Sequence, residues 1–140
     1  MEQSQSKITL KGLIIKHEGL RLKPYRCSAG KLTIGVGRNL DDVGITREEA
    51  EILLNGDIER SAHDAMTIFP RFFTYSDNRQ NAIIDMLFNL GKSRFMKFKK
   101  MIKAIYLCDW EEASLQAKDS RWYKQVGVRA GEDVVMLREG

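Results

Sequence analysis

One strand-favouring stretch interrupts a sequence that is otherwise patterned for helices. Pro24 disfavours a helix, the pair Ala29-Gly30 offers a turn, and the residues from Thr33 to Val36 favour extended backbone. The flanking sequence carries apolar residues at helical spacing. We therefore predict an α+β fold, with a small hairpin or short sheet over about residues 24–40 and a helical body for the rest.

The helical segments are marked by their apolar stripes and by residues that favour helix ends. Thr46 and Glu49 have the spacing of a capping box, and Asp109 and Glu112 repeat that spacing. A long apolar face is expected between Ala50 and Met66. The predicted helices cover residues 7–17 with Gly19 as the stop, residues 46–70, residues 76–90 with Gly91 as the stop, residues 95–105, a short helix capped by Asp109, and one helix after Gly127.

Length and composition predict one soluble domain. The 140 residues suffice for a single domain over residues 1–140, and 43% hydrophobic with 30% charged residues is typical of a globular protein with a core. Cys27 and Cys108, with two histidines, lack metal-ligand spacing, so we expect no metal and no cofactor. The first twenty residues make a polar start with only a short apolar patch from Leu13 to Ile15, which is not a signal sequence, and no apolar run is long enough to cross a bilayer, so we expect a cytoplasmic protein.

A net charge of +4 fits an anionic partner without choosing among nucleic acid, cell wall and membrane. The basic residues gather in one segment that also contains Phe95, Phe98 and Ile102. Such a segment is either a cationic amphipathic helix for a membrane or nucleic acid, or the solvated face of a helix packed in the core. The apolar spacing favours the second interpretation. The basic residues are Lys92, Arg94, Lys97, Lys99, Lys100 and Lys103.

Three residues near the N-terminus carry groups suited to acid–base chemistry. Glu18 falls at the predicted end of the first helix, where the helix dipole disfavours an ionised carboxylate, and partial burial would act in the same direction. A carboxyl that keeps its proton serves as a general acid, although an ordinary surface glutamate is the simpler interpretation of Glu18 alone. Cys27 is either a small buried hydrophobe or a thiolate favoured by nearby cations. Thr33 faces it across the predicted turn, an arrangement that suits glycoside cleavage.

The sequence resembles the phage-type lysozymes, glycoside hydrolase family 24, which include the T-even bacteriophage lysozyme. The family's spacing of glutamate, eight residues, aspartate or cysteine, five residues and threonine appears as Glu18, Cys27 and Thr33. The resemblance spans roughly Ile8 to Leu137. The matching segments are Glu18-Gly19-Leu20-Arg21-Leu22, Tyr25, Leu32-Thr33-Ile34-Gly35-Val36-Gly37, Met86-Leu87-Phe88-Asn89-Leu90-Gly91, Asp109-Trp110-Glu111-Glu112-Ala113 and Ser120-Arg121-Trp122-Tyr123.

The resemblance implies a lysozyme-like fold, with a small N-terminal β lobe and a larger helical lobe flanking a cleft. It also implies an endolysin that hydrolyses the β-1,4 bond between N-acetylmuramic acid and N-acetylglucosamine with inversion. Glu18 would protonate the leaving oxygen, Thr33 would position the attacking water, and Cys27 would act as base, transient nucleophile or electrostatic stabiliser. Phe88 and Asn89 match a segment that lines the family's cleft, and Arg129 matches an arginine beside the catalytic glutamate. These last three residues are therefore the candidate substrate contacts.

Three departures from the family pattern bear on these roles. Cys27 stands where a well-studied member has aspartate, and a neutral thiol would stabilise an oxocarbenium-like transition state less well. Arg38 stands where that member has a histidine in a structural ion pair, so we expect that pair to be absent. Ala29 replaces a cleft glutamate and removes one sugar contact.

The resemblance further implies a monomer that acts on the peptidoglycan glycan strand. The protein would collect in the host cytoplasm and reach the wall in the periplasm through a holin-type pore. A catalytically weak wall-binding protein and a cationic membrane-active protein, with membrane contact through Lys92 to Lys103, are the alternatives. A nucleic-acid binder is not expected, because no reading motif accompanies the basic segment.

Overall fold

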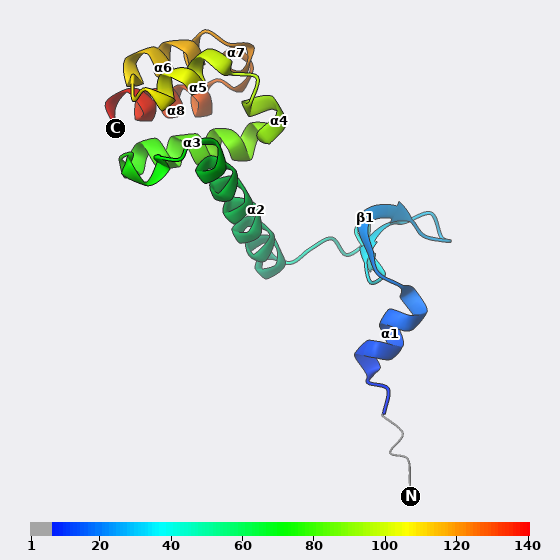
Figure 1. The fold of residues 1–140 in the computed structure, drawn as a ribbon. Helices are drawn as coiled ribbons and strands as arrows, with labels where there is room; N and C mark the ends of the chain where they lie inside the picture. The colour runs from blue at the N-terminus through cyan, green and yellow to red at the C-terminus, as the bar shows by residue number, and fades with distance from the viewer. Residues whose placement is uncertain (1–6) are drawn as a thin grey trace, which may run out of the picture. The chain divides into compact units, whose positions relative to one another are not determined.

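A computed structural model describes residues 7–140 of the chain, so the first six residues of the predicted polar start lie outside the described residues (Figure 1). The chain divides into two compact units, an N-terminal unit that ends at Glu51 and a helical unit from Ile52 to Gly140. The single domain expected over residues 1–140 stays a prediction. Helices and one small antiparallel sheet confirm the α+β class.

The N-terminal unit consists of a helix followed by a three-stranded sheet of order β1-β2-β3. The Thr9 hydroxyl caps the helix by accepting a hydrogen bond from the Gly12 N–H at 3.0 Å. Gly19 ends the helix with φ +74°, a backbone conformation that glycine adopts without strain. The elements are α1 (Leu10–Glu18), β1 (Arg21–Arg26), β2 (Leu32–Gly35) and β3 (Arg38–Asn39).

The sheet begins earlier than predicted, because Pro24 lies inside β1 rather than at its start. β1 is an edge strand, where a residue without an N–H group is tolerated. The pairing of β1 with β2 is also irregular between Arg21 and Tyr25, which spares Pro24 a regular ladder position. Beyond this irregularity Tyr25 pairs with Thr33, as a hairpin requires.

α2 (Arg47–Ile68) begins with the predicted capping box. The Glu49 N–H donates to the Thr46 hydroxyl at 3.1 Å, and the Thr46 N–H donates to the Glu49 carboxylate at 3.0 Å. The helix ends two residues before Pro70, as expected. The predicted apolar face is only partly confirmed: Ala65 is buried, whereas Leu53 and Leu54 are 57% and 45% exposed.

The helical unit is built around α8, which packs against α3, α6 and α7, while α5 packs against α6 (Figure 1). The predicted cap at Asp109 is confirmed, since Asp109 accepts a hydrogen bond from the Glu112 N–H. Ser76, predicted only as the start of a helix, is also a cap and accepts a hydrogen bond from the Arg79 N–H. The elements after α2 are the 3-10 turn η1 (Phe72–Thr74), α3 (Asp77–Leu90), α4 (Lys92–Phe95), α5 (Lys99–Tyr106), α6 (Trp110–Lys118), α7 (Arg121–Val126) and α8 (Val128–Glu139).

Two helix predictions in this unit were wrong. The single helix expected over residues 95–105 is two helices, because the chain leaves helical geometry at Phe98 with ψ 58°. This break allows both Phe95 on α4 and Ile105 on α5 to be fully buried. α7 was not predicted as a helix. Its N-cap, the Ser120 hydroxyl that accepts from the Tyr123 N–H at 3.1 Å, is a local signal that was missed.

The core of the helical unit is aromatic at its centre. Phe69 is fully buried, and its ring meets those of Tyr75, Phe95 and Tyr106 at centroid distances of 6.2–6.3 Å. The buried apolar residues are Ala65, Phe69, Phe72, Tyr75, Ala82, Ile83, Met86, Leu87, Phe95, Met101, Ala104, Ile105, Ala113, Ala117, Trp122, Ala130, Val134 and Leu137.

No helix within residues 7–140 combines the length and apolar character needed to cross a membrane.

Candidate functional site

Glu18 is the last residue of α1, directly before the glycine that ends the helix. Its side chain is exposed, so the partial burial considered from the sequence is not found within the N-terminal unit. The carboxylate lies against the backbone of Gly37, where an added Cβ would come within 2.9 Å of Oε2. Gly37 has φ +72°, a backbone conformation that glycine adopts without strain. Its lack of a side chain leaves room for the Glu18 carboxylate.

Cys27 and Thr33 lie together at the β1–β2 hairpin, as the sequence predicted. Cys27 follows the last residue of β1, and its N–H donates to the Lys31 carbonyl at 3.0 Å across the turn. Thr33 follows on β2, paired with Tyr25, and its hydroxyl donates to the same carbonyl at 2.8 Å. Thr33 is buried and Cys27 is half-buried.

The hairpin turn favours the thiolate form of Cys27. Its pKa lies below the ordinary cysteine value because the backbone N–H groups of Lys31 and, to a smaller degree, Ala29 donate to the sulfur. The Thr33 hydroxyl lowers this pKa further when it donates to the sulfur. A hydroxyl has one proton, so Thr33 serves either the sulfur or the Lys31 carbonyl at a given time. The turn therefore places a half-buried thiol with a lowered pKa next to a hydroxyl.

Arg38 does form an ion pair, although not the one whose absence was expected from the family pattern. Its guanidinium donates to the Glu49 carboxylate at 2.7 Å and to the Gly44 carbonyl at 3.2 Å. The Arg38 hydrogen bond, with the Thr46 N–H, lowers the pKa of Glu49 to about 2. Arg38 thus links the end of the sheet to the capping box of α2.

The helical unit brings together the other three candidate residues, Phe88, Asn89 and Arg129. Phe88 and Asn89 lie at the C-terminal end of α3, and the Arg129 guanidinium on α8 stands 5.9 Å from the centre of the Phe88 ring. The Trp122 indole N–H donates to the Asn89 side-chain oxygen at 2.8 Å. Asn89 therefore has a structural partner, while its amide N–H groups can donate to a ligand.

Arg129 holds a carboxylate cluster that sequence reasoning missed. Its guanidinium makes two hydrogen bonds to Asp85, at 2.7 and 3.0 Å, and these lower the pKa of Asp85. Asp133, one helical turn after Arg129, is 3% exposed, and its Oδ2 has no hydrogen-bond partner among the described residues. Burial, and then the neighbouring Asp85, raise the pKa of Asp133 to about 8. The four-residue spacing of Arg129 and Asp133 was the available sequence signal.

The cluster lies beside a largely apolar pocket of about 570 Å³ within the helical unit. Phe88, Ile84 and Met136 form part of its wall, with Asp85 and Arg129. Among residues 7–140 no group of three or more His, Cys, Asp or Glu side chains has the arrangement of a metal site.

A match to a known family covers both groups of residues. Residues 15–137 match the family described as phage lysozyme, a segment that includes Glu18, Cys27, Thr33 and Arg129. The chain belongs to the phage lysozyme family. Family membership makes it a lysozyme-type glycoside hydrolase, in agreement with the resemblance found in the sequence.

Individual relatives agree with this assignment. An endolysin of Acyrthosiphon pisum secondary endosymbiont phage 1 is 35% identical over 84% of this chain and 80% of its own. A protein of Dictyostelium discoideum described as a probable T4-type lysozyme is 27% identical over 94% of this chain and 95% of its own. The pre-baseplate central spike protein Gp5 of Enterobacteria phage T4 is 28% identical over 91% of this chain. This chain spans only 27% of the spike protein's length.

Proposed function

We propose that this lysozyme is an endolysin and a muramidase. It would hydrolyse the β-1,4 bond between N-acetylmuramic acid and N-acetylglucosamine in peptidoglycan, with Glu18 protonating the leaving oxygen. The observation that carries the proposal is the exposure of the Glu18 carboxyl in a member of a lysozyme family. The carboxyl is exposed beside Gly37 and makes no hydrogen bond or ion pair with the described residues of the N-terminal unit. An acidic group without a partner in its own unit can donate to a sugar oxygen.

Thr33 and Cys27 would act on the attacking water. The Thr33 hydroxyl is fixed by β2 and by the Lys31 carbonyl, so a water bonded to it would be held in one place. Attack by that water with departure of the protonated sugar inverts the anomeric carbon. The lowered pKa of Cys27 makes its thiolate available as the base or as an electrostatic stabiliser of the oxocarbenium-like transition state.

Phe88, Asn89 and Arg129 would bind the substrate. Phe88 is 39% exposed and offers an apolar ring face to a sugar. The Asn89 amide N–H groups remain free to donate once Trp122 has occupied its oxygen. Arg129 is engaged by Asp85, so its part in binding would be to hold the position of Phe88.

We further propose that the enzyme leaves the host cytoplasm through a holin-type pore and causes host lysis. It would work as a monomer. The endolysin among its relatives supports this place in the phage cycle. A dependence on holin is tested by expressing the protein in cells with and without a holin gene and following culture turbidity. Clearing without holin would contradict it. A single sedimentation species with the mass of a dimer would contradict the monomer.

The first experiment digests purified peptidoglycan with the wild type, with Glu18→Gln, and with the control Glu48→Gln, which changes an exposed acid in the first turn of α2. New reducing ends are identified by mass spectrometry. We expect reducing muramic acid from the wild type and the control, and a rate about 10²–10⁴-fold lower from Glu18→Gln, because a general acid contributes that much. Reducing glucosamine instead of muramic acid would assign a different bond.

Binding of peptidoglycan without cleavage by a folded wild type would support the alternative, a catalytically weak wall-binding protein.

The role of Cys27 in cleavage is resolved by comparing Cys27→Ala and Cys27→Asp while the anomeric form of the product is followed by NMR. We expect inversion in every active variant, with Cys27→Asp more active than Cys27→Ala. A retained anomeric configuration, with a sugar covalently attached to Cys27, would make the thiol a nucleophile.

A further inference from the structure

The basic segment from Lys92 to Lys103 is not used by the proposed chemistry. It holds six Lys and Arg residues and no Asp or Glu up to Tyr106, in a chain whose whole net charge is +4. All six side chains are exposed, and none forms an ion pair with any residue between positions 7 and 140. These six residues, termed here the cationic surface, are Lys92, Arg94, Lys97, Lys99, Lys100 and Lys103.

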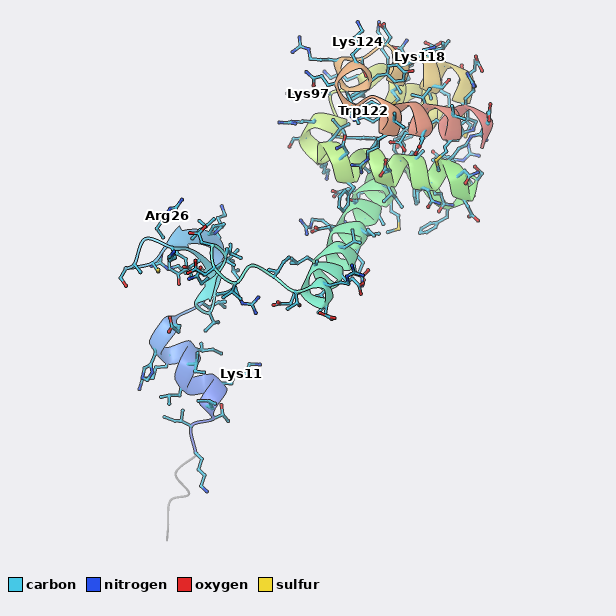
Figure 2. All side chains as sticks on the ribbon, turned by 180° about the vertical axis from the view of Figure 1, so that it is seen from behind. Lys11, Arg26, Lys97, Lys118, Trp122 and Lys124 are labelled. Carbon is cyan, nitrogen blue, oxygen red and sulfur yellow. The ribbon has the colours of Figure 1, made fainter. Side chains whose placement is uncertain are left out.

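Half of the cationic surface surrounds a hollow. Lys97, Lys99 and Lys100 line a pocket of about 420 Å³ whose other polar lining comes from Gln116, Ser120 and the acidic Asp119. Figure 2 shows the labelled side chains of Lys97, Lys118 and Lys124 projecting outward from the helical unit. Unpaired cations around a hollow favour an anionic group of small size.

The apolar side of the same segment is already occupied. Phe95, Met101 and Ile105 are at most 1% exposed and belong to the core of the helical unit. Insertion of α5 into a bilayer as an amphipathic helix would require these residues to leave that core, at a cost of several kcal/mol. The segment is therefore the solvated face of packed helices, and any membrane contact is made through charge at the bilayer surface.

The exposed neighbours of the cationic surface favour a lipid surface over a nucleic acid. Nucleic-acid binding without base readout uses exposed aromatic rings on which bases stack, but Phe98 is half-buried, Trp122 is only 5% exposed, and the ring of Tyr106, although 50% exposed, packs against Phe69. The exposed apolar neighbours are Met96 and Leu107, which are 42% and 70% exposed. Apolar and amphipathic side chains among lysines are the composition that lies at a bilayer interface.

We propose that the cationic surface binds the protein to anionic phospholipid bilayers from the outside, without insertion. The lysines would contact lipid phosphates, and the pocket beside Lys99 would receive one headgroup. Clusters of four to eight Lys and Arg bind anionic membranes additively, and each cation contributes about a factor of five. This binding does not depend on muramidase activity, because the surface lies outside the residues assigned to the reaction.

The test measures co-sedimentation with vesicles made of equal parts phosphatidylglycerol and phosphatidylcholine. The triple variant Lys97→Gln/Lys99→Gln/Lys100→Gln is compared with Lys7→Gln/Lys11→Gln/Lys16→Gln, which removes the same charge from exposed, unpaired lysines of the N-terminal unit. We expect the first variant to need about one hundred-fold more lipid for half-binding, and the control only a few-fold more. Binding should vanish at 1 M salt, where screening shortens to about 3 Å.

Four results would overturn the proposal. Absence of vesicle binding by the wild type would show that the cationic surface does not bind lipid. Equal weakening in the two triple variants would show that the net charge of the protein, and not a defined surface, determines the binding. Tighter binding to single-stranded DNA than to vesicles at equal phosphate concentration would make a nucleic acid the partner. Dye leakage from the vesicles with loss of the near-ultraviolet circular dichroism signal would show insertion and unpacking. Cleavage of peptidoglycan fragments, unchanged in both variants, confirms that each is folded.

Discussion

The two units of this chain differ in what holds them together. In the N-terminal unit Thr33 is the only buried residue among positions 7–51, and α1 has no buried side chain at all. Its local order comes from the caps of α1 and α2, from the hairpin, and from ion pairs such as Arg38–Glu49. The helical unit instead has a continuous apolar core centred on Phe69.

The residues proposed for the reaction and the residues of the apolar core therefore lie in different units. The acid, thiol and hydroxyl groups proposed for the reaction lie in the unit that buries little apolar surface of its own, while the helical unit contains the buried apolar core. Apolar burial contributes about 25 cal/mol per Å², so a unit without buried apolar side chains gains little from it. Polar groups free of a tight core remain available to a substrate.

The largest effect is expected from a pair of truncations that tests this contrast. Phe69→Ala should lower the free energy of unfolding by about 3–5 kcal/mol, because it empties the centre of the aromatic core. Leu22→Ala in β1, where Leu22 is 81% exposed, should change it by no more than about 0.5 kcal/mol. Calorimetric unfolding of both variants checks this. A cost for Leu22→Ala equal to that of Phe69→Ala would show a second core and break the comparison.

A smaller effect, confined to the helical unit, concerns Asp133. Its pKa is raised to about 8 in the folded protein, against about 4 in an unfolded chain, so the folded state retains a proton that the unfolded state releases. The free energy of unfolding should therefore fall as the pH rises from about 4 to about 8. Below pH 4 both states are protonated and the effect is absent.

Asp133→Asn keeps a donor for Asp85 and removes this titration. The melting temperature of the variant should fall less than that of the wild type between pH 5 and 8, and at pH 8 the variant should be the more stable protein. Ser114→Ala, which removes a buried hydroxyl bonded to the Glu111 carbonyl, serves as a control without a titrating group. Parallel pH profiles for wild type and Asp133→Asn would show that Asp133 is ionised when folded.

The smallest effect is expected in the N-terminal unit, at Glu49. Because Arg38 and Thr46 hold the pKa of Glu49 at about 2, below the value near 4.3 of an unfolded chain, the stabilising ion pair is present above pH 4.3. It should be lost as the pH falls from about 4 toward 2. In Arg38→Gln, a side-chain carboxyl NMR titration should show the Glu49 pKa moving up toward its ordinary value. An unchanged titration would mean that the capping box alone holds Glu49.

Part of the fold was predictable because its causes are local. The capping box of Thr46 and Glu49, the cap at Asp109, and the stops at Gly19 and Gly91 each involve residues within a few positions of one another. The break at Phe98 was not predictable, because the helical stripe continues through it in the sequence. It exists because Phe95 and Ile105 enter the same core from two directions.

The candidate site shows the same limit. Sequence spacing alone placed Cys27 beside Thr33, since a hairpin joins them within a few residues, and it placed Glu18 at a helix end. The tertiary structure decided that Arg129 pairs with Asp85, that Trp122 holds Asn89, and that the pKa of Asp133 is raised. These contacts join α3 to α7 and α8 across more than thirty positions, and burial, which sets the pKa of Asp133, exists only once those helices have packed.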